Sequence, residues 1–329
     1  MPARSTTPPS SSRKAPDLDI LGISDVMRQL TRQIDRAAAT DASVFIVGES
    51  GAGKELVARA IHAGSPRADR PFVAVNCGAI SRSLAHAVLF GHEKGSFTGA
   101  LAQNAGYFEH ASGGTLFLDE VTEMSTDMQV HFLRVLETGT YQRVGGTDLL
   151  RANVRLICAS NRDPLEAVAQ GRLREDFLHR LLVVPLRVPP LRERLEDIPV
   201  LAQRMLDDLN KSNRSDKRFA PAMIEALQRY DWPGNVRELK NIVQRAYIMA
   251  DNEIGDALAP KPRPMAAGAG DEDQLDIAVG TNLADAQRRL ILATLAQCDD
   301  DKQRAAQALG ISVKTLYNRL AAYDIPADE

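Results

Sequence analysis

Eight consecutive residues have the types and order needed to hold a phosphate group. They are Gly48, Glu49, Ser50, Gly51, Ala52, Gly53, Lys54 and Glu55, between the apolar run 43–47 and a helical pattern over 56–61. Glycines have no Cβ, so successive backbone N–H groups can close around a phosphate, and the N-terminus of the next helix adds partial positive charge. Lys54 would reach the outer phosphates. We predict a phosphate-binding P-loop; the alternative is a glycine-rich turn with an exposed lysine. The strict pattern has Ser or Thr after the lysine, whereas this chain has Glu55.

Two further apolar runs end in polar side chains. The run 113–118 is followed by Asp119 and Glu120, and the run 154–159 by Ser160 and Asn161. Parallel strands carry their active groups at their carboxyl ends, beside the P-loop. We predict that Asp119 holds Mg²⁺, that Glu120 orients and deprotonates a water molecule, and that Asn161 senses the γ-phosphate. The alternatives are a solvated acidic turn and a plain turn residue.

Arginines supply candidate cations for the same chemistry. Arg174 and Arg180 lie on the helical stretch 173–181. From the residues alone, a solvated helix face paired with neighbouring carboxylates is the favoured interpretation. Arg237 lies in the first turn of a helical pattern over 236–249, where the helix dipole disfavours a cation. This misfit indicates a function, such as reaching a nucleotide from a helical lid.

A glycine-bounded loop over 91–100 places Phe97 and Thr98 at its tip. A soluble monomer gains by burying a phenylalanine, so an exposed one would point to a partner. Burial of Phe97 within its own domain remains the alternative.

The elements that must position these residues alternate strands and helices, which predicts an α/β domain with a parallel sheet. We expect helices over 18–39, 84–90 and 128–136, strands over 71–76 and 182–186, and a turn or hairpin over 141–146. Helical patterns over 198–210, 221–230 and 236–249 predict a helical lid. The expected domains are a disordered tail (1–17), the α/β subdomain (18–187), the lid (188–256), a linker (257–280) and a C-terminal domain (281–329).

The C-terminal segment has the pattern of a helix-turn-helix. Helical stretches over 283–296 and 302–309 are followed by the turn 310–311 and by a third helix that Ser312 caps. Leu316 and Leu320 would face inward. The candidate DNA-contacting residues are Ser312, Lys314, Thr315, Asn318 and Arg319. Acidic residues slightly outnumber basic ones in this segment, so we expect weak DNA binding by a monomer. A helical oligomerisation module is the alternative.

Composition restricts the class of protein. The chain has 329 residues, of which 44% are hydrophobic and 25% charged, and its net charge is −3. No apolar run is long enough to span a membrane, and the first residues have no apolar core of a signal peptide. The three cysteines, Cys77, Cys158 and Cys298, lack metal-ligand spacing. We therefore expect a cytoplasmic protein.

These motifs together resemble the bacterial enhancer-binding proteins, the AAA+ ATPases that activate sigma-54 RNA polymerase. The P-loop is similar to that family's Walker A loop, in which a glutamate follows the lysine as Glu55 does here. Residues 95–100, Gly-Ser-Phe-Thr-Gly-Ala, resemble the family's GAFTGA loop, with Ser96 in place of its first alanine. The resemblance covers nearly all of 18–323, and the C-terminal helices resemble a Fis-type helix-turn-helix.

The resemblance implies roles that the residues alone leave open. Phe97, Thr98 and Gly99 would contact sigma-54, and Asn76 would be the switch that restrains Glu120. Ser160 and Asn161 would form sensor I, where the family usually has Thr-Asn. Arg174 and Arg180 would be arginine fingers for a neighbouring subunit, and Arg237 would be sensor II. The implied cofactors are ATP and Mg²⁺, and the implied partners are sigma-54, RNA polymerase, enhancer DNA and further copies of the chain, as a hexamer.

Two other functions remain open from the sequence. One is an AAA+ ATPase of DNA remodelling or replication initiation, which would lack the Phe-Thr loop. The other is a DNA-binding regulator whose ATPase core serves only for assembly. A short tail stands where family members carry a receiver or ligand-sensing domain. We therefore expect control by a separate inhibitory protein or by abundance.

Overall fold

The computed structural model describes residues 20–81, 83–97, 100–260, 282–298 and 301–322. The chain divides into two compact units, Met1–Lys261 and Pro262–Glu329, which are described separately below. The first unit contains an α/β subdomain and a helical lid, and the second is all-helical. The predicted fold class is therefore confirmed.

A parallel five-stranded sheet forms the centre of the first unit, in the order β2-β3-β6-β1-β7. Its strands are β1 (Val44–Val47), β2 (Phe72–Asn76), β3 (Thr115–Asp119), β6 (Arg155–Ser160) and β7 (Val184–Arg187). The register pairs Asn76 with Asp119 and Val47 with Ser160. The polar residues at the strand ends therefore meet at one edge of the sheet, beside the P-loop.

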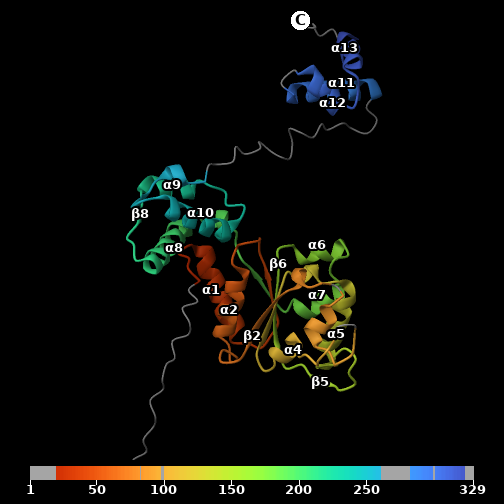
Figure 1. Ribbon diagram of the computed structural model, residues 1–329, viewed down its shortest axis with the longest axis vertical. Coiled ribbons are helices and arrows are strands. Elements are labelled where there is room, and N and C mark those ends of the chain that lie inside the picture. Colours follow the sequence, from red (N-terminus) through yellow and green to blue (C-terminus); the bar gives the residue numbers. More distant parts are fainter. Residues whose placement is uncertain (1–19, 82, 98–99, 261–281, 299–300, 323–329) are drawn as a thin grey trace, which may run out of the picture. The chain divides into compact units, whose positions relative to one another are not determined.

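Side chains alternate between two apolar layers, so both faces of the sheet are covered, as a parallel sheet requires. On β1, Val44 and Ile46 pack in one layer with α1 and α2, whereas Phe45 packs in the other with aromatic residues such as Phe132. Figure 1 shows α1 and α2 on one side of the sheet and α5 and α7 on the other. The helices of this subdomain are α1 (Asp25–Ala38), α2 (Lys54–Ala63), α3 (Ala85–Phe90), α4 (Tyr107–His110), α5 (Thr126–Thr138), α6 (Pro164–Ala169) and α7 (Glu175–Leu181).

The first helix is shorter than predicted, because it begins at Asp25 rather than near residue 18. Its buried face includes Met27, Leu30 and Ile34, whereas Ile23 and Val26 are exposed. The backbone N–H groups of Ile23 and Ser24 donate to the buried carboxylate of Asp197, so the segment before the helix is held in place by a residue outside it. The apolar spacing alone could not reveal this contact.

The predicted hairpin is present as the antiparallel pair β4 (Thr140–Tyr141) and β5 (Leu150–Arg151). Its loop contacts the base of the Phe97 loop, since the N–H of Glu93 donates to the carbonyl of Val144. Two short 3₁₀ helices complete the subdomain, η1 (Cys77–Ala79) and η2 (Val121–Glu123), and two more begin the lid, η3 (Leu191–Glu193) and η4 (Leu195–Asp197).

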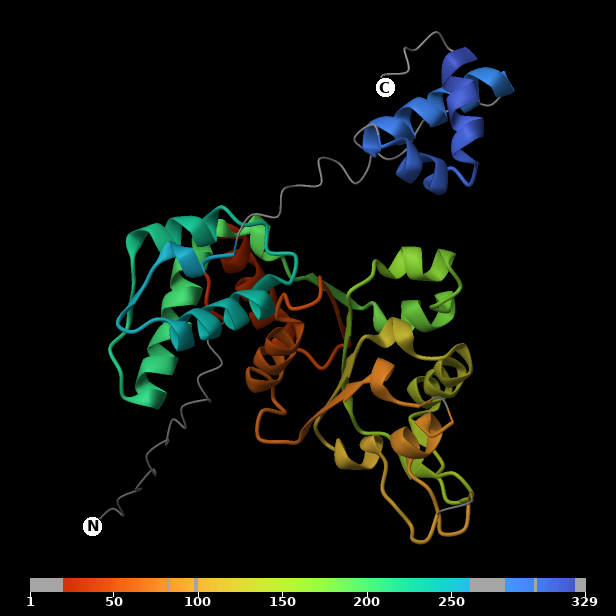
Figure 2. The same ribbon diagram turned by 45° about the horizontal axis from the view of Figure 1, so that its top comes forward.

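The lid packs around the fully buried Trp232. Figure 2 shows its helices beside α1 and α2. Trp232 donates from its indole nitrogen to the carbonyl of Leu227, so its polar atom is satisfied within the core. The lid consists of α8 (Ile198–Asn213), β8 (Arg218–Phe219), α9 (Pro221–Gln228), α10 (Asn235–Met249), β9 (Glu253–Ile254) and η5 (Asp256–Leu258).

The second unit consists of α11 (Leu283–Gln297), α12 (Lys302–Ala308) and α13 (Val313–Ala322). Its core includes Ile291, Ala305 and Leu316, and Gly310 takes the positive φ of 65° that the turn between α12 and α13 requires. The three predicted helices and the inward orientation of Leu316 and Leu320 are confirmed.

Two absences hold for the described residues. None of their helices combines the length and the apolar character needed to cross a membrane. The three cysteines are free, and within the described part of the chain no three His, Cys, Asp or Glu side chains converge on a metal position.

Candidate active site

The P-loop joins β1 to α2, as predicted. Gly51 has a φ of 77° and Gly53 a φ of 108°, values that L side chains rarely adopt. A Cβ on Gly51 would lie 2.5 Å from the carbonyl oxygen of Gly234, so the loop also touches the lid too closely for any other residue. Gly53 is the N-cap of α2, which leaves the helix N-terminus free to donate toward an anion.

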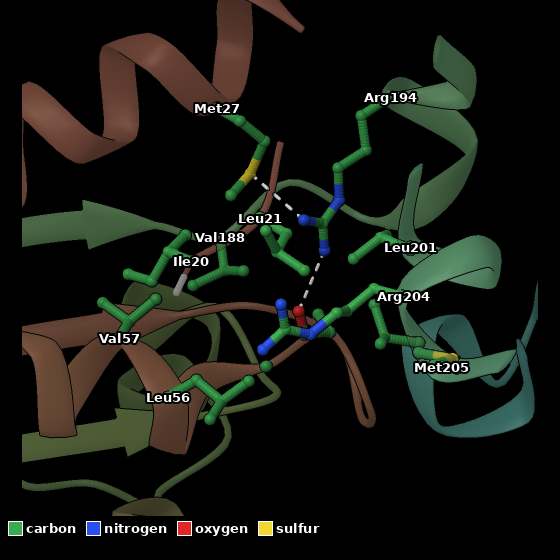
Figure 3. Close-up of a pocket in the computed structure, with 13 residues that line it drawn as sticks. Ile20, Leu21, Met27, Leu56, Val57, Val188, Arg194, Leu201, Arg204 and Met205 are labelled. Carbon is green, nitrogen blue, oxygen red and sulfur yellow. Dashed lines mark hydrogen bonds between the residues drawn. The ribbon is translucent and has the colours of Figure 1, made fainter. Parts of the chain in front are cut away.

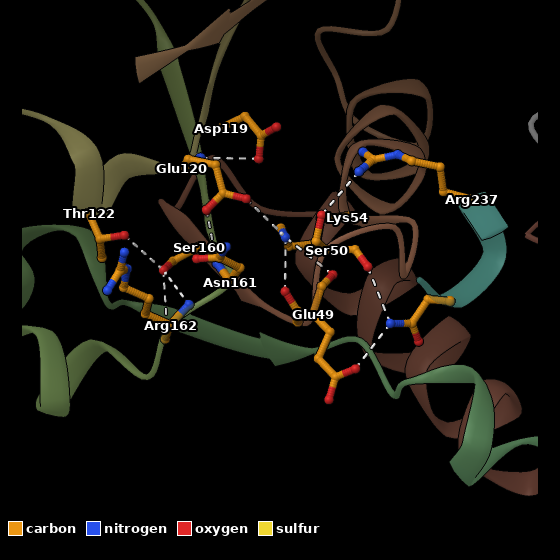
Figure 4. A network of polar contacts seen from close by, with 12 residues as sticks. Glu49, Ser50, Lys54, Asp119, Glu120, Thr122, Ser160, Asn161, Arg162 and Arg237 are labelled. Atoms are coloured by element: carbon orange, nitrogen blue, oxygen red, sulfur yellow. Dashed lines mark hydrogen bonds and ion pairs between the residues drawn. The ribbon is translucent and has the colours of Figure 1, made fainter. Parts of the chain in front are cut away.

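Lys54 is buried and lies between the P-loop and the end of β3. Its Nζ donates to the carbonyl of Gly48 at 2.8 Å and lies 3.4 Å from Oε1 of Glu120. Figure 4 shows this ammonium group between the two elements. The sequence prediction that Lys54 and Glu120 share one site is therefore supported by their contact.

Asp119 and Glu120 end β3 side by side (Figure 4). Glu120 has a φ of 52°, and its Oε2 accepts a hydrogen bond from the backbone N–H of Asn161 at 3.1 Å. Burial, and then the neighbouring charge of Glu120, raise the pKa of Asp119 above its usual value. Two adjacent carboxylates in a half-buried site repel each other, and a bound cation would reduce this repulsion. Oxygen ligands of this kind suit Mg²⁺, so these residues fit a magnesium ion held by Asp119.

Ser160 is the last residue of β6, and Asn161 follows it directly. Ser160 is fully buried, and its Oγ contacts Thr122 Oγ1 at 3.2 Å and accepts from the N–H of Arg162 at 3.0 Å. Asn161 is exposed, and its backbone rather than its side chain contacts Glu120. Ser160 therefore holds the backbone that follows β6, and the N–H of Asn161 positions the carboxylate of Glu120.

Arg237 reaches the P-loop from the lid. Its Nη1 donates to Ser50 Oγ at 3.0 Å, and its N–H donates to the carbonyl of Gly51 at 3.3 Å. A cleft of about 400 Å³ lies at this junction. It is lined by Ser50, Gly51, Gly53, Lys54, Glu55, Leu56, Asp119, Glu120, Val236, Arg237 and Lys240.

A second, apolar pocket of about 180 Å³ shares Gly53, Leu56 and Val236 with the polar cleft. Figure 3 shows apolar side chains of the N-terminal segment, α2 and the lid around it, with Arg194 above them. Arg194 donates from Nη2 to the carbonyl of Ala52 at 3.0 Å. Sequence reasoning missed this pocket, because its walls come from distant segments: Ile20, Leu21, Met27, Val57, Val188, Leu201, Arg204 and Met205.

Three predicted catalytic residues do not line the cleft in the described structure. Asn76 accepts from the N–H of Ala79 at 3.1 Å and caps η1. The guanidinium of Arg174 donates to both carboxylate oxygens of Asp176, and Arg180 Nη2 donates to the carbonyl of Leu136. The pairing of Arg174 with Asp176 is the surface contact that the residues alone had favoured.

Phe97 is 37% exposed, and its ring packs at 5.0 Å from that of His92. Thr98 and Gly99 lie outside the described residues. The buried Ser96 Oγ has no hydrogen-bond partner among the described residues and lies against Gly145 of the β4–β5 loop. Arg143 from the same loop makes ion pairs with Glu93 and Glu109, at 2.8 and 2.6 Å, and so ties the two loops together.

In the second unit, the candidate DNA-contacting side chains lie on α13 or cap it. Ser312 Oγ accepts from the N–H of Thr315 at 3.1 Å, which confirms the predicted cap. Lys314 and Asn318 are exposed, whereas Thr315 and Arg319 are partly buried. The hydroxyl groups of Ser312 and Thr315 also contact each other, so the cap already engages both.

Comparisons with known proteins assign all three segments. A family model described as the sigma-54 interaction domain matches residues 20–187, an AAA+ ATPase lid domain matches 192–264, and the Fis family of bacterial regulatory proteins matches 282–323. Regulatory protein LuxO of Vibrio vulnificus is 41% identical over 312 residues, which cover 92% of this chain and 69% of that protein. Response regulator protein PilR of Pseudomonas aeruginosa is 44% identical over 317 residues, covering 95% and 71%. The crystal structure of NtrX from Brucella abortus in complex with ATP has a TM-score of 0.69 at 34% identity, covering 93% and 69%.

Proposed function

The chain belongs to the sigma-54 interaction family of AAA+ ATPases, with a Fis-type DNA-binding domain, and on this premise we propose how its residues couple ATP hydrolysis to transcription. It is a sigma-54-dependent transcription regulator and an ATPase.

The proposal rests on two adjacent pockets, which share Gly53, Leu56 and Val236 in their walls. A nucleotide has an apolar base and anionic phosphates, and here an apolar pocket of about 180 Å³ adjoins a polar cleft of about 400 Å³ around the P-loop. We place the base against residues such as Ile20 and Leu21, and the phosphates between the N-terminus of α2, Lys54 and Arg237.

Hydrolysis then depends on Glu120. Its carboxylate is held by the N–H of Asn161 on one oxygen and approached by Lys54 on the other. When Lys54 turns to the phosphates, Glu120 is free to take a proton from the attacking water. Mg²⁺ held by Asp119 would neutralise charge on the phosphates.

Arg174 and Arg180 do not line the cleft of their own chain in the described structure. Both are exposed, on and beside α7. We propose that they enter the cleft of a neighbouring subunit in a ring, by family resemblance a hexamer. An arginine supplied in this way is worth about 10³–10⁵ in rate, so a monomer should be nearly inactive.

Coupling to sigma-54 is assigned to Phe97, Thr98 and Gly99. Ion pairs of Arg143 hold the base of this loop, so a shift of the neighbouring hairpin loop would move it. We propose that Asn76 acts as the switch that restrains Glu120, and this is supported by the β2–β3 pairing, in which Asn76 lies opposite Asp119. Opening about ten base pairs costs on the order of 14 kcal/mol at about 1.4 kcal/mol per stacking step, which explains the need for ATP.

The second unit would hold the ring at enhancer DNA. Lys314, Asn318 and Arg319 lie on α13, the helix that would enter the major groove. Because this segment is slightly acidic overall, we propose that several copies bind together. Control by a separate inhibitory protein stays a prediction.

The proposal is tested by open-complex formation with sigma-54 RNA polymerase on an enhancer-bearing template. Thr98→Ala should retain ATP hydrolysis and lose transcription, because only the coupling loop is changed. Lys54→Ala should lose both, and it serves as the control for the nucleotide site. If Thr98→Ala still activated transcription, the loop would not be the coupling element. DNA remodelling without sigma-54 would favour the replication-type alternative.

A further inference from the structure

Glu49 belongs to the P-loop, yet its carboxylate is bound to the lid. Arg192 of η3 donates from Nη1 to Oε2 at 2.8 Å and from Nη2 to Oε1 at 2.5 Å. Asn235, the first residue of α10, donates from Nδ2 to Oε2 at 3.0 Å. Both oxygens of Glu49 are therefore engaged by residues more than 140 positions away in the sequence.

Asn235 is fully buried and uses both ends of its amide. Its Oδ1 accepts from the N–H of Leu191 at 2.8 Å, and its Nδ2 also donates to the carbonyl of Ser50 at 3.2 Å. Its φ is 52°, a conformation that costs a non-glycine residue energy and persists only where the surroundings hold it. The start of α10 is thus fixed against the P-loop by side-chain contacts.

Arg237 lies two residues after Asn235 in the first turn of α10, so the contacts that fix Asn235 also fix the backbone position of Arg237. The N–H of Arg237 donates to the carbonyl of Gly51, and its Nη1 donates to Ser50 Oγ, so its guanidinium lies at the wall of the polar cleft. A small rotation of α10 would carry this guanidinium away from the phosphates.

We propose that Glu49 is a positioning residue: by holding Arg192 and Asn235 it latches the lid to the P-loop and so aims Arg237 at the nucleotide. This latch, defined as Glu49, Arg192 and Asn235, rests on the proposed nucleotide site. It extends that function by making the affinity for the triphosphate depend on a contact outside the phosphate-binding surface.

The energetics indicate that the latch acts through geometry more than through stability. The side chains of Arg192 and Glu49 are 47% and 39% exposed, and ion pairs in such positions add little to the free energy of unfolding. If loss of the latch displaced the guanidinium of Arg237, in contrast, the nucleotide would lose a charged hydrogen bond to its phosphate. Such a bond is worth about tenfold or more in affinity.

The test is the affinity of the full-length chain for AMPPNP, a non-hydrolysable ATP analogue, measured by calorimetry. Glu49→Ala and Arg192→Ala should each weaken binding by about tenfold. The double substitution Glu49→Ala/Arg237→Ala should bind no more weakly than Arg237→Ala alone, because Glu49 acts through Arg237. Glu49→Gln should retain part of the affinity, since its amide oxygen still accepts from Asn235 or Arg192.

A neighbouring ion pair provides the matched control. Arg187 donates to both oxygens of Glu193, at 2.8 and 2.6 Å, and Glu193 is about as exposed as Glu49. Among the described residues, no hydrogen bond or ion pair joins Glu193 to the P-loop. Glu193→Ala should therefore leave the AMPPNP affinity unchanged.

Three outcomes would overturn the proposal. If Glu49→Ala bound AMPPNP as tightly as the wild type, the latch would be refuted, whereas the nucleotide site would not be. Additive losses in the double substitution would show that Glu49 acts independently of Arg237. A wild-type chain that binds no AMPPNP would overturn the nucleotide site itself, and the latch with it.

Discussion

The pKa of the Glu49 carboxylate is lowered to about 2 by hydrogen bonds from Arg192 and Asn235, which outweigh the opposing effect of burial. The group is therefore ionised in the folded chain at every pH at which the chain would work. Its stabilising contribution is complete above the unfolded pKa near 4.5 and is lost as the pH falls from there toward 2.

This window gives a prediction for Glu49→Gln. The difference in free energy of unfolding between the wild type and this variant should be small, because the ion pair is more than a third exposed. It should be constant from pH 7 to pH 5 and should shrink below about pH 4.5. Urea unfolding at a series of pH values measures it. A difference that already changed between pH 7 and pH 6 would contradict the assignment of the low pKa to Glu49.

Residues that act through local patterns could be predicted from the sequence. The P-loop, Asp119 and Glu120 follow apolar runs, and parallel strands must bring such ends together. The contacts of Glu49 with Arg192 and Asn235 could not be predicted, because they depend on how the lid docks. The apolar pocket was missed for the same reason, since Ile20 and Met205 belong to no common motif.

At the scale of elements, the segment before α1 shows how a distant residue sets a boundary. Asp197 accepts from the N–H groups of Ile23 and Ser24 at 2.6 and 2.8 Å and from Ser24 Oγ at 2.8 Å. The negative charge of Asp197 lies at the N-terminus of α1, where the helix dipole stabilises it. The same contacts hold the segment whose Ile20 and Leu21 line the apolar pocket.

Asp197→Ala should therefore lower the free energy of unfolding by about 2–4 kcal/mol, because it leaves buried donors without acceptors. Asp197→Asn should cost less, since its amide oxygen can still accept from the backbone. Thermal unfolding compares the two variants, and AMPPNP binding should weaken in parallel with the loss of the pocket wall. An alanine variant as stable as the wild type would show that Asp197 does not hold this segment.

For the whole molecule, the sequence pattern predicted the α/β subdomain, the lid and the helical C-terminal unit, because each has its own periodicity and core. It could not show that Arg174 and Arg180 do not line the cleft of their own chain. In the described structure the guanidinium of Arg174 pairs with Asp176, and that of Arg180 donates to the carbonyl of Leu136.

Mixing variants tests whether the site forms between subunits. Arg174→Ala and Glu120→Gln should each be nearly inactive alone, since each removes a part worth orders of magnitude in rate. A mixture should recover part of the turnover, because some subunit interfaces then combine an intact Arg174 with an intact Glu120. ATP turnover of the mixture, compared with the sum of the separate variants, measures the recovery. A mixture no more active than that sum would place the arginine in its own cleft or outside catalysis.

We propose that the cleft around Lys54, Asp119 and Glu120 binds ATP and that Glu120 is the base that splits it. The most direct test compares ATP binding and ATP turnover in the wild type and in Glu120→Gln. The variant should bind ATP with an affinity close to that of the wild type, while its turnover falls by about 10²–10⁴, because a general base is lost without loss of shape. Turnover at the wild-type rate in Glu120→Gln would show that Glu120 is not the general base.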